Sequence, residues 1–150
     1  MTTNVELSVF NLNAALIGLA GLLICFFVQV LTVNVAIRVM LPKITFSVSK
    51  MWKIFPRVIF FSSVLMLLCS HLVQIFLWSY LLFITGIIQN LGKAFVFAGS
   101  IYSTVGFSTD PLTEQWQLIT VIMAASGLFT FGWSTSIIFM LAQKITPLDK

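Results

Sequence analysis

Charged residues are scarce in this 150-residue chain, where Lys, Arg, Asp and Glu together make up only 8% of the sequence. A soluble domain usually carries about 25% charged residues. Hydrophobic residues reach 59%, and the mean hydropathy is +1.08. One soluble core cannot hold so much apolar surface, so the composition indicates an integral membrane protein. The eight cations flank apolar runs and do not form the basic surface of a nucleic-acid-binding protein, so no nucleic-acid partner is expected.

Groups suited to catalysis or metal binding are equally scarce. The sequence has one His, two Cys and four acids. Cys25 and Cys69 lie inside apolar runs without a His or Cys at metal-ligand spacing, and we expect both to be small buried apolar side chains. A membrane enzyme needs a nucleophile, a base or metal ligands close together. We therefore predict that the chain is not an enzyme and carries no cofactor.

Three apolar runs are long enough to cross a bilayer as helices, which takes about 20 residues. They cover residues 14–37, 58 to about 88, and 118–142. The stretch between the second and third runs, residues 89–117, holds a shorter apolar piece at 94–102 that cannot span a bilayer. The sequence predicts three transmembrane helices and no soluble domain.

The cations predict the orientation of these helices. Two cations follow the third run, one lies between the second and third runs, and five lie between the first and second: Lys144 and Lys150; Lys93; Arg38, Lys43, Lys50, Lys53 and Arg57. Positive charge collects on the cytoplasmic side of membrane proteins. We therefore expect a multi-pass protein of the cell (inner or plasma) membrane with its N-terminus outside and its C-terminus in the cytoplasm. The basic loop is interpreted mainly as a topology anchor that contacts membrane lipids, with a lipid sensor as the alternative.

The polar segment STVGFSTD, residues 103–110, follows the short apolar piece and precedes the third run. Non-helical backbone is tolerated at membrane depth only where protein buries it or water lines it. A short helix followed by such a segment indicates a re-entrant loop. An ordinary outer loop with a short amphipathic helix fits the pattern equally well.

This segment resembles the filter of the two-transmembrane-type potassium channel pore family, which reads TVGYG. Thr104-Val105-Gly106-Phe107 matches its first four positions, with Phe in place of Tyr. AFVFAGSIYSTVGF, residues 94–107, is similar to the pore helix and filter of small bacterial ion-channel proteins of this type. His71, Trp78 and the GWST of residues 132–135 are similar to parts of the outer and inner helices in one branch of the family. The resemblance covers residues 70–143, about half of the chain, and leaves the first span as an extra helix.

The resemblance implies an all-α membrane fold of three transmembrane helices plus a re-entrant pore helix and filter loop. Four copies would form a homotetramer around a central pore. Residues 1–57 would supply a peripheral transmembrane helix and a basic cytoplasmic loop, and residues 58–150 the pore domain, with its pore helix over residues 91–102. Permeant K⁺, or Na⁺, would be coordinated by backbone carbonyls in place of its hydration shell. Those carbonyls belong to Thr104, Val105, Gly106 and Phe107.

The sequence departs from the family at the outer end of the filter. Ser108 replaces the second filter glycine, and an L-residue with positive φ costs about 1 kcal/mol or more. Asp110 comes one residue later than the family's acid. Three outcomes stay open: a potassium channel with fewer sites, a weakly selective Na⁺/K⁺ channel, or a non-conducting structural or regulatory subunit. Asp110 and Glu114 would form an acidic outer mouth, or else lie in a solvated loop.

A few further residues within the spans are candidates for gating. His71 lies mid-span with Gln74 one turn further on, and it is either a pH-sensitive group or a neutral side chain satisfied by Gln74, Ser70 or a neighbouring helix. Gly127 and Gly132 interrupt the third span, either as a hinge or for close helix packing. Gln29 in the first span is expected to face the second span.

Overall fold

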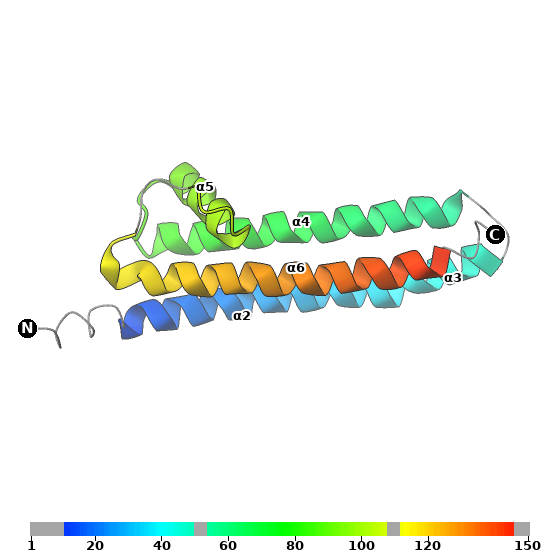
Figure 1. Cartoon of the computed structure of the whole chain (residues 1–150), viewed down its shortest axis with the longest axis horizontal. Coiled ribbons are helices and arrows are strands. Elements are labelled where there is room, and N and C mark those ends of the chain that lie inside the picture. Colours follow the sequence, from blue (N-terminus) through cyan, green and yellow to red (C-terminus); the bar gives the residue numbers. More distant parts are fainter. Residues whose placement is uncertain (1–10, 50–53, 108–111, 146–150) are drawn as a thin grey trace, which may run out of the picture. The chain divides into compact units, whose positions relative to one another are not determined.

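The described residues of the computed structural model, 11–49, 54–107 and 112–145, form helices and connecting turns without a strand. Three long helical stretches and one short helix follow one another along the chain (Figure 1). The elements are α2 (Leu12–Val35), the π-helical turn η1 (Ala36–Met40), α3 (Leu41–Ser49), α4 (Phe55–Ile84), α5 (Leu91–Tyr102), the 3₁₀ turn η2 (Glu114–Trp116) and α6 (Gln117–Ile145).

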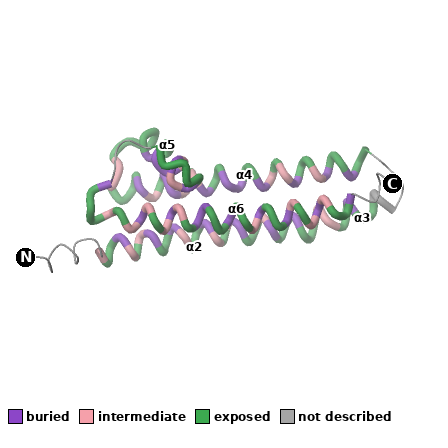
Figure 2. The backbone as a smooth tube through the Cα atoms, in the orientation of Figure 1, coloured by how far each residue is buried: buried purple, intermediate pink, exposed green. Residues whose placement is uncertain are grey.

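Three of these stretches are long and apolar enough to cross a membrane: Leu12–Phe46, Phe55–Ile84 and Glu114–Ile145. By the length and composition of these helices, the prediction of three spans in a multi-pass membrane protein is confirmed. Large apolar side chains remain exposed along all three. Figure 2 shows exposed positions along the length of each of these helices. Lipid tails are as apolar as a protein core, so such side chains can face outward in a bilayer.

The boundary of the second span differs from the prediction. The apolar run continues to about residue 88, but α4 ends at Ile84. Gly86 has a φ of +72°, and the N–H of Ile88 bonds back to the Leu82 carbonyl at 3.2 Å. A glycine in the left-handed region just after a helix satisfies its last carbonyls and stops it.

The first long helix contains a proline that it accommodates by a local change of winding. Pro42 lacks an N–H, and its ring would press on the carbonyl four residues back. The chain adopts the π-helical turn Ala36–Met40 immediately before it, where the N–H of Leu41 bonds to the Ala36 carbonyl. A π turn inserts one extra residue and so absorbs this conflict without ending the helix.

The helices pack in two compact units, each with its own core. The first unit combines the chain up to Phe27 with Val73–Phe129; the second combines Val28–Leu72 with the chain from Thr130. Trp78 and Tyr102 are the largest fully buried side chains of the first core. In the second core Ile44, Leu67 and Leu141 come from three different helices. The prediction that residues 1–57 and 58–150 differ in function stays a prediction.

Within the first unit, α2 packs against both α4 and α6. Glycines replace side chains at the contacts: a Cβ on Gly21 would overlap the ring of Trp78 on α4, and one on Gly18 would overlap Ile122 on α6. Small residues let helix backbones approach closely, which is the usual basis of helix association in membranes. The helix α2 is therefore in direct contact with both α4 and α6.

The two cysteines differ. Cys25 is buried in the first core, as predicted, but Cys69 is exposed, so that part of the prediction is wrong. Its position in an apolar run could not distinguish the two outcomes, because a transmembrane helix is apolar on its lipid-facing side as well.

Candidate functional site

The short helix α5 starts at a well-defined cap. The side chain of Asn90 accepts a hydrogen bond of 3.0 Å from the backbone N–H of Lys93, and its carbonyl accepts from the N–H of Ala94. An Asn in this position satisfies a donor that the first turn of a helix leaves free. The prediction of a helix over residues 91–102 is confirmed by α5.

The other end of α5 is held between two long helices. Tyr102, its last residue, is fully buried and donates a 2.9 Å hydrogen bond to Oε1 of Gln74 on α4. Its backbone carbonyl lies against Gly127 of α6, where any side chain would overlap it. Gln74 precedes the end of α4, and Gly127 follows the start of α6, by about ten residues, or about 15 Å along each axis. The end of α5 is thus seated well inside the ends of both helices.

A second buried hydrogen bond joins α4 and α6 beside this seat. Nε1 of Trp78 donates to Oγ of Ser126 at 3.2 Å, and that hydroxyl donates to the Met123 carbonyl of its own helix at 2.7 Å. An indole N–H buried in an apolar core needs such an acceptor. The bond holds together the two helices that form the seat of α5.

The chain leaves α5 in a turn with alternating backbone conformations. Thr104 has a φ of +61° and Gly106 a φ of +68°, while Ser103, before them, has −80°. The N–H of Thr104 bonds to the Ile101 carbonyl at 2.9 Å, and that of Gly106 to the Ser100 carbonyl at 3.0 Å. A β-branched residue in the left-handed region is strained by about 1–2 kcal/mol. Strain of this kind concentrates at functional sites.

The residues after α5 are not covered by their own chain. Residues 103–107 are all exposed, including the apolar side chains of Val105 and Phe107, at 66% and 61% exposure. No atom lies within 4 Å of the position that a Gly106 side chain would take. Ser108 and Asp110 lie outside the described residues, and Glu114 opens η2 with an exposed side chain. Thr104 to Phe107 therefore form a continuous exposed segment.

His71 belongs to a different polar cluster, in the second unit. Its Nε2 lies 3.0 Å from Oγ of Ser134 on α6, and its ring stacks on Phe131 at 4.2 Å. Nε2 of Gln29 donates to the same hydroxyl at 2.9 Å. His71 and Gln74 lie about one turn apart on α4; His71 contacts Ser134 of α6, and Gln74 accepts a hydrogen bond from Tyr102 of α5. Gln29 was expected to face the second span; its bonded hydroxyl lies on the third span, and the same hydroxyl also contacts His71 of the second.

The two glycines of the third span have different surroundings. Gly127 faces the Tyr102 carbonyl, whereas no atom lies within 4 Å of a Cβ built on Gly132. Of the two interpretations for Gly127, the contact favours close packing. The open space beside Gly132 is compatible with a hinge and with close helix packing.

Sequence reasoning missed Tyr102 and Ser126 as anchoring residues. The available signal for Tyr102 was a tyrosine at the end of a short apolar piece, directly before the polar segment. Among residues 11–49, 54–107 and 112–145, no three His, Cys, Asp or Glu side chains are grouped as metal ligands would be.

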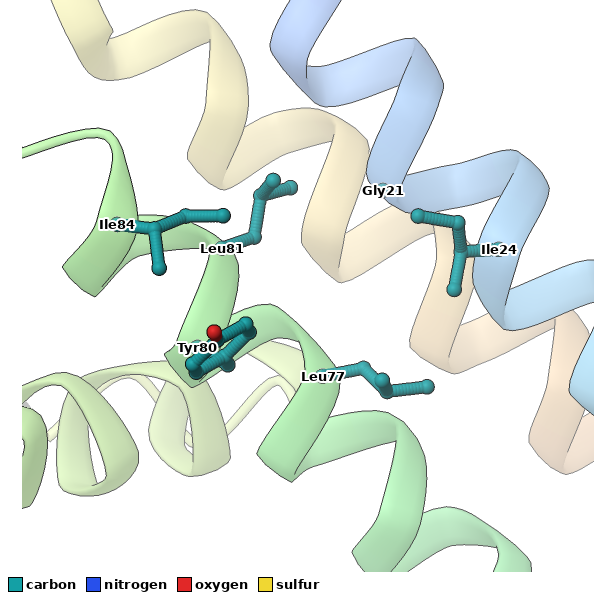
Figure 3. A pocket seen from close by; sticks show the side chains of 6 residues that line it. All are labelled: Gly21, Ile24, Leu77, Tyr80, Leu81 and Ile84. Atoms are coloured by element: carbon teal, nitrogen blue, oxygen red, sulfur yellow. The ribbon is translucent and has the colours of Figure 1, made fainter.

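An apolar hollow of about 280 Å³ lies between α2 and α4 in the first unit. Its lining residues come from both helices, with Tyr80 supplying a hydroxyl (Figure 3): Gly21, Ile24, Leu77, Tyr80, Leu81 and Ile84. None of these residues belongs to the exposed segment after α5.

Comparison with known proteins finds no match, either among family models, among curated proteins or among solved structures. The resemblance of residues 70–143 to the potassium channel pore family therefore stays a prediction based on the motif.

Proposed function

We propose that this protein is a monovalent cation channel, with α5 as a re-entrant pore helix and Thr104–Phe107 as its ion filter. The observation that carries the proposal is the buried end of α5, which is followed directly by exposed backbone with alternating φ. In the cell membrane, the N-terminus would face outside and the C-terminus the cytoplasm. The main permeant ion would be K⁺, and a weakly selective Na⁺/K⁺ pore is the nearest variant.

The seat of α5 supports the re-entrant arrangement. Tyr102 contacts α4 and α6 about 15 Å inside their ends. The hydrocarbon core of a bilayer is about 30 Å thick. With those helix ends at the membrane surface, α5 would carry the chain about halfway across and return it to the same side.

The backbone of the segment suits cation binding. Peptide carbonyls are strong acceptors, and a change of φ sign from one residue to the next turns successive carbonyls toward one side. Positive φ at Thr104 and Gly106, on either side of Val105, supplies such a change. A ring of carbonyls from several chains can then replace the hydration shell of an alkali cation.

Assembly of several copies would complete the site. One chain alone leaves Val105 and Phe107 uncovered, yet irregular backbone at membrane depth must be buried in protein or line a water-filled path. Neighbouring copies around an axis would meet both needs. The number four comes from the resemblance of the motif.

Ser108 marks the point where the proposal is most open to test. It stands where the family has a glycine, and this favours the second candidate function, a non-conducting structural or regulatory subunit. Asp110 and Glu114 would form an acidic outer mouth that concentrates cations. His71 and Gly132 are proposed to act in gating, His71 through its contact with Ser134.

Flux measurements on the purified protein in liposomes test the proposal. We expect K⁺ flux that exceeds Na⁺ flux, and we expect Gly106→Ala to abolish it, because an alanine at φ +68° is strained whatever the space. Gly86→Ala is a matched control, with φ +72° and equally open surroundings outside the filter. It should keep its flux.

Two outcomes would contradict the channel. Intact oligomers that pass neither K⁺ nor Na⁺ would establish the non-conducting candidate. Equal flux in the wild type and Gly106→Ala would remove the filter from residues 104–107. Ser108→Gly should raise the K⁺/Na⁺ ratio, and an unchanged ratio would show that Ser108 does not limit selectivity.

A further inference from the structure

The described part of the second unit carries cations and no acid. Residues 28–49, 54–72 and 130–145 contain no Asp or Glu. Their four cations all have exposed side chains: Arg38, Lys43, Arg57 and Lys144. Like charges that lie close together repel one another unless an anion or a high dielectric compensates them. This cationic end of the second unit is therefore suited to an anionic partner.

The core of the second unit brings three of these cations to the same end. Ile44, Ile59 and Ile145 are buried in one cluster, although they come from α3, α4 and α6. Lys43 precedes the first, Arg57 stands two residues before the second, and Lys144 precedes the third. Each cation thus lies within two residues of an isoleucine that is buried in the shared core.

Exposed apolar side chains stand directly beside the cations. Arg38 lies between Ile37 and Val39, which are 38% and 41% exposed. Arg57 is flanked by Phe55 and Val58, at 49% and 57%. A soluble anion makes no favourable contact with this apolar surface, whereas a phospholipid presents a charged headgroup and acyl chains together.

The lengths of the helices put two of these cations at the depth of lipid headgroups. The three candidate spans have 35, 30 and 32 residues, so each is about 45 Å long or more. A bilayer is about 40–45 Å thick with its headgroups and about 30 Å without. Arg57, in the first turn of α4, and Lys144, in the last turn of α6, would then lie at headgroup level.

We propose that the cationic end of the second unit, formed by Arg38, Lys43, Arg57 and Lys144, is a binding surface for the headgroups of anionic phospholipids. The phosphate and any further headgroup charge contact the cations, while the acyl chains lie along the exposed apolar side chains beside them. This surface does not depend on ion conduction, and it holds equally for a non-conducting subunit.

Native mass spectrometry of the detergent-purified full chain tests this surface with phosphatidylglycerol and phosphatidylcholine as probes. A membrane-surface cation contributes about 1 kcal/mol to binding of anionic lipid, or about fivefold in affinity. We expect the wild type to retain phosphatidylglycerol preferentially. The triple variant Arg38→Gln, Lys43→Gln, Lys144→Gln should reduce that preference by about tenfold or more. Arg57 is kept because it also interacts within the chain.

Lys93→Gln is the matched control, because Lys93 is an exposed cation of the first unit. It should leave the lipid preference unchanged. The proposal is overturned if the triple variant keeps the wild-type preference, or if Lys93→Gln lowers it equally. If excess inorganic phosphate displaces the lipid, the surface is instead a site for a soluble anion, and the lipid proposal is overturned. Should the triple variant fail to fold, Lys43→Gln and Lys144→Gln alone must each lower the preference about fivefold.

Discussion

Both units join α4 to α6 through buried polar side chains, but they differ in the third helix that such side chains attach. In the first unit, α4 bonds to α6 through Trp78 and Ser126, and Gln74 of α4 bonds to Tyr102 of α5. In the second unit, α4 bonds to α6 through His71 and Ser134, and the third partner is Gln29 of α2. A polar side chain buried in a membrane protein needs a partner, and the nearest helix that supplies one is fixed beside it. In the first unit that helix is α5, too short to cross the membrane.

The largest change in the free energy of unfolding should come from Gly127, the glycine of α6 that lets the end of α5 pack closely. Gly127→Ala places a Cβ into the Tyr102 carbonyl, so we expect a loss of about 1–3 kcal/mol in the free energy of unfolding. Gly132→Ala is the control from the second unit: its Cβ meets open space, and alanine favours a helix by up to about 1 kcal/mol. Thermal unfolding in detergent measures both. Equal unfolding midpoints for the two variants would show that the close packing of α5 against Gly127 does not stabilise the fold.

The next effect distinguishes the two serines of α6. Ser134→Ala removes hydrogen bonds to side chains of two other helices, α2 and α4, and Ser126→Ala removes the bond from Trp78 of α4. A buried hydrogen bond in a membrane protein contributes about 0.6 kcal/mol on average. We expect Ser134→Ala to destabilise the fold about twice as much as Ser126→Ala in the same unfolding assay. If Ser126→Ala destabilised the fold more than Ser134→Ala, the first unit would depend more on its buried hydrogen bond than the second unit does.

The smallest effect should come from the hydroxyl that ties α5 to α4. Tyr102→Phe removes the bond to Gln74 and should cost about 1 kcal/mol or less. Tyr80→Phe is its control, because the Tyr80 side chain is about half exposed. A double-mutant cycle with Gln74→Leu isolates the pair. Additive effects of the two substitutions would show that the hydroxyl and the amide do not stabilise one another.

Much of the architecture could be predicted from residue order alone. The three long apolar runs became three long helices, and the short apolar piece at 94–102 became part of α5. The ends were less certain: Gly86 stops α4 before the apolar run is over, because a left-handed glycine outweighs the hydropathy that follows. Of the candidate site, the position of residues 104–107 after α5 was predictable, but the seat of Tyr102 between Gln74 and Gly127 was not.

The sequence by itself determined that this is a helical, membrane-spanning chain, because scarcity of charge and length of apolar run depend only on composition and order. It also determined where the cations lie along the chain. The tertiary structure alone decided which polar side chains meet: Gln29 and His71 both contact Ser134, and Gln74 accepts from Tyr102. It also decided that Cys69 faces outward. The reason is physical. A helix that is apolar on every side has no hydrophobic stripe to reveal its rotation, so only packing against its neighbours selects the face that is buried.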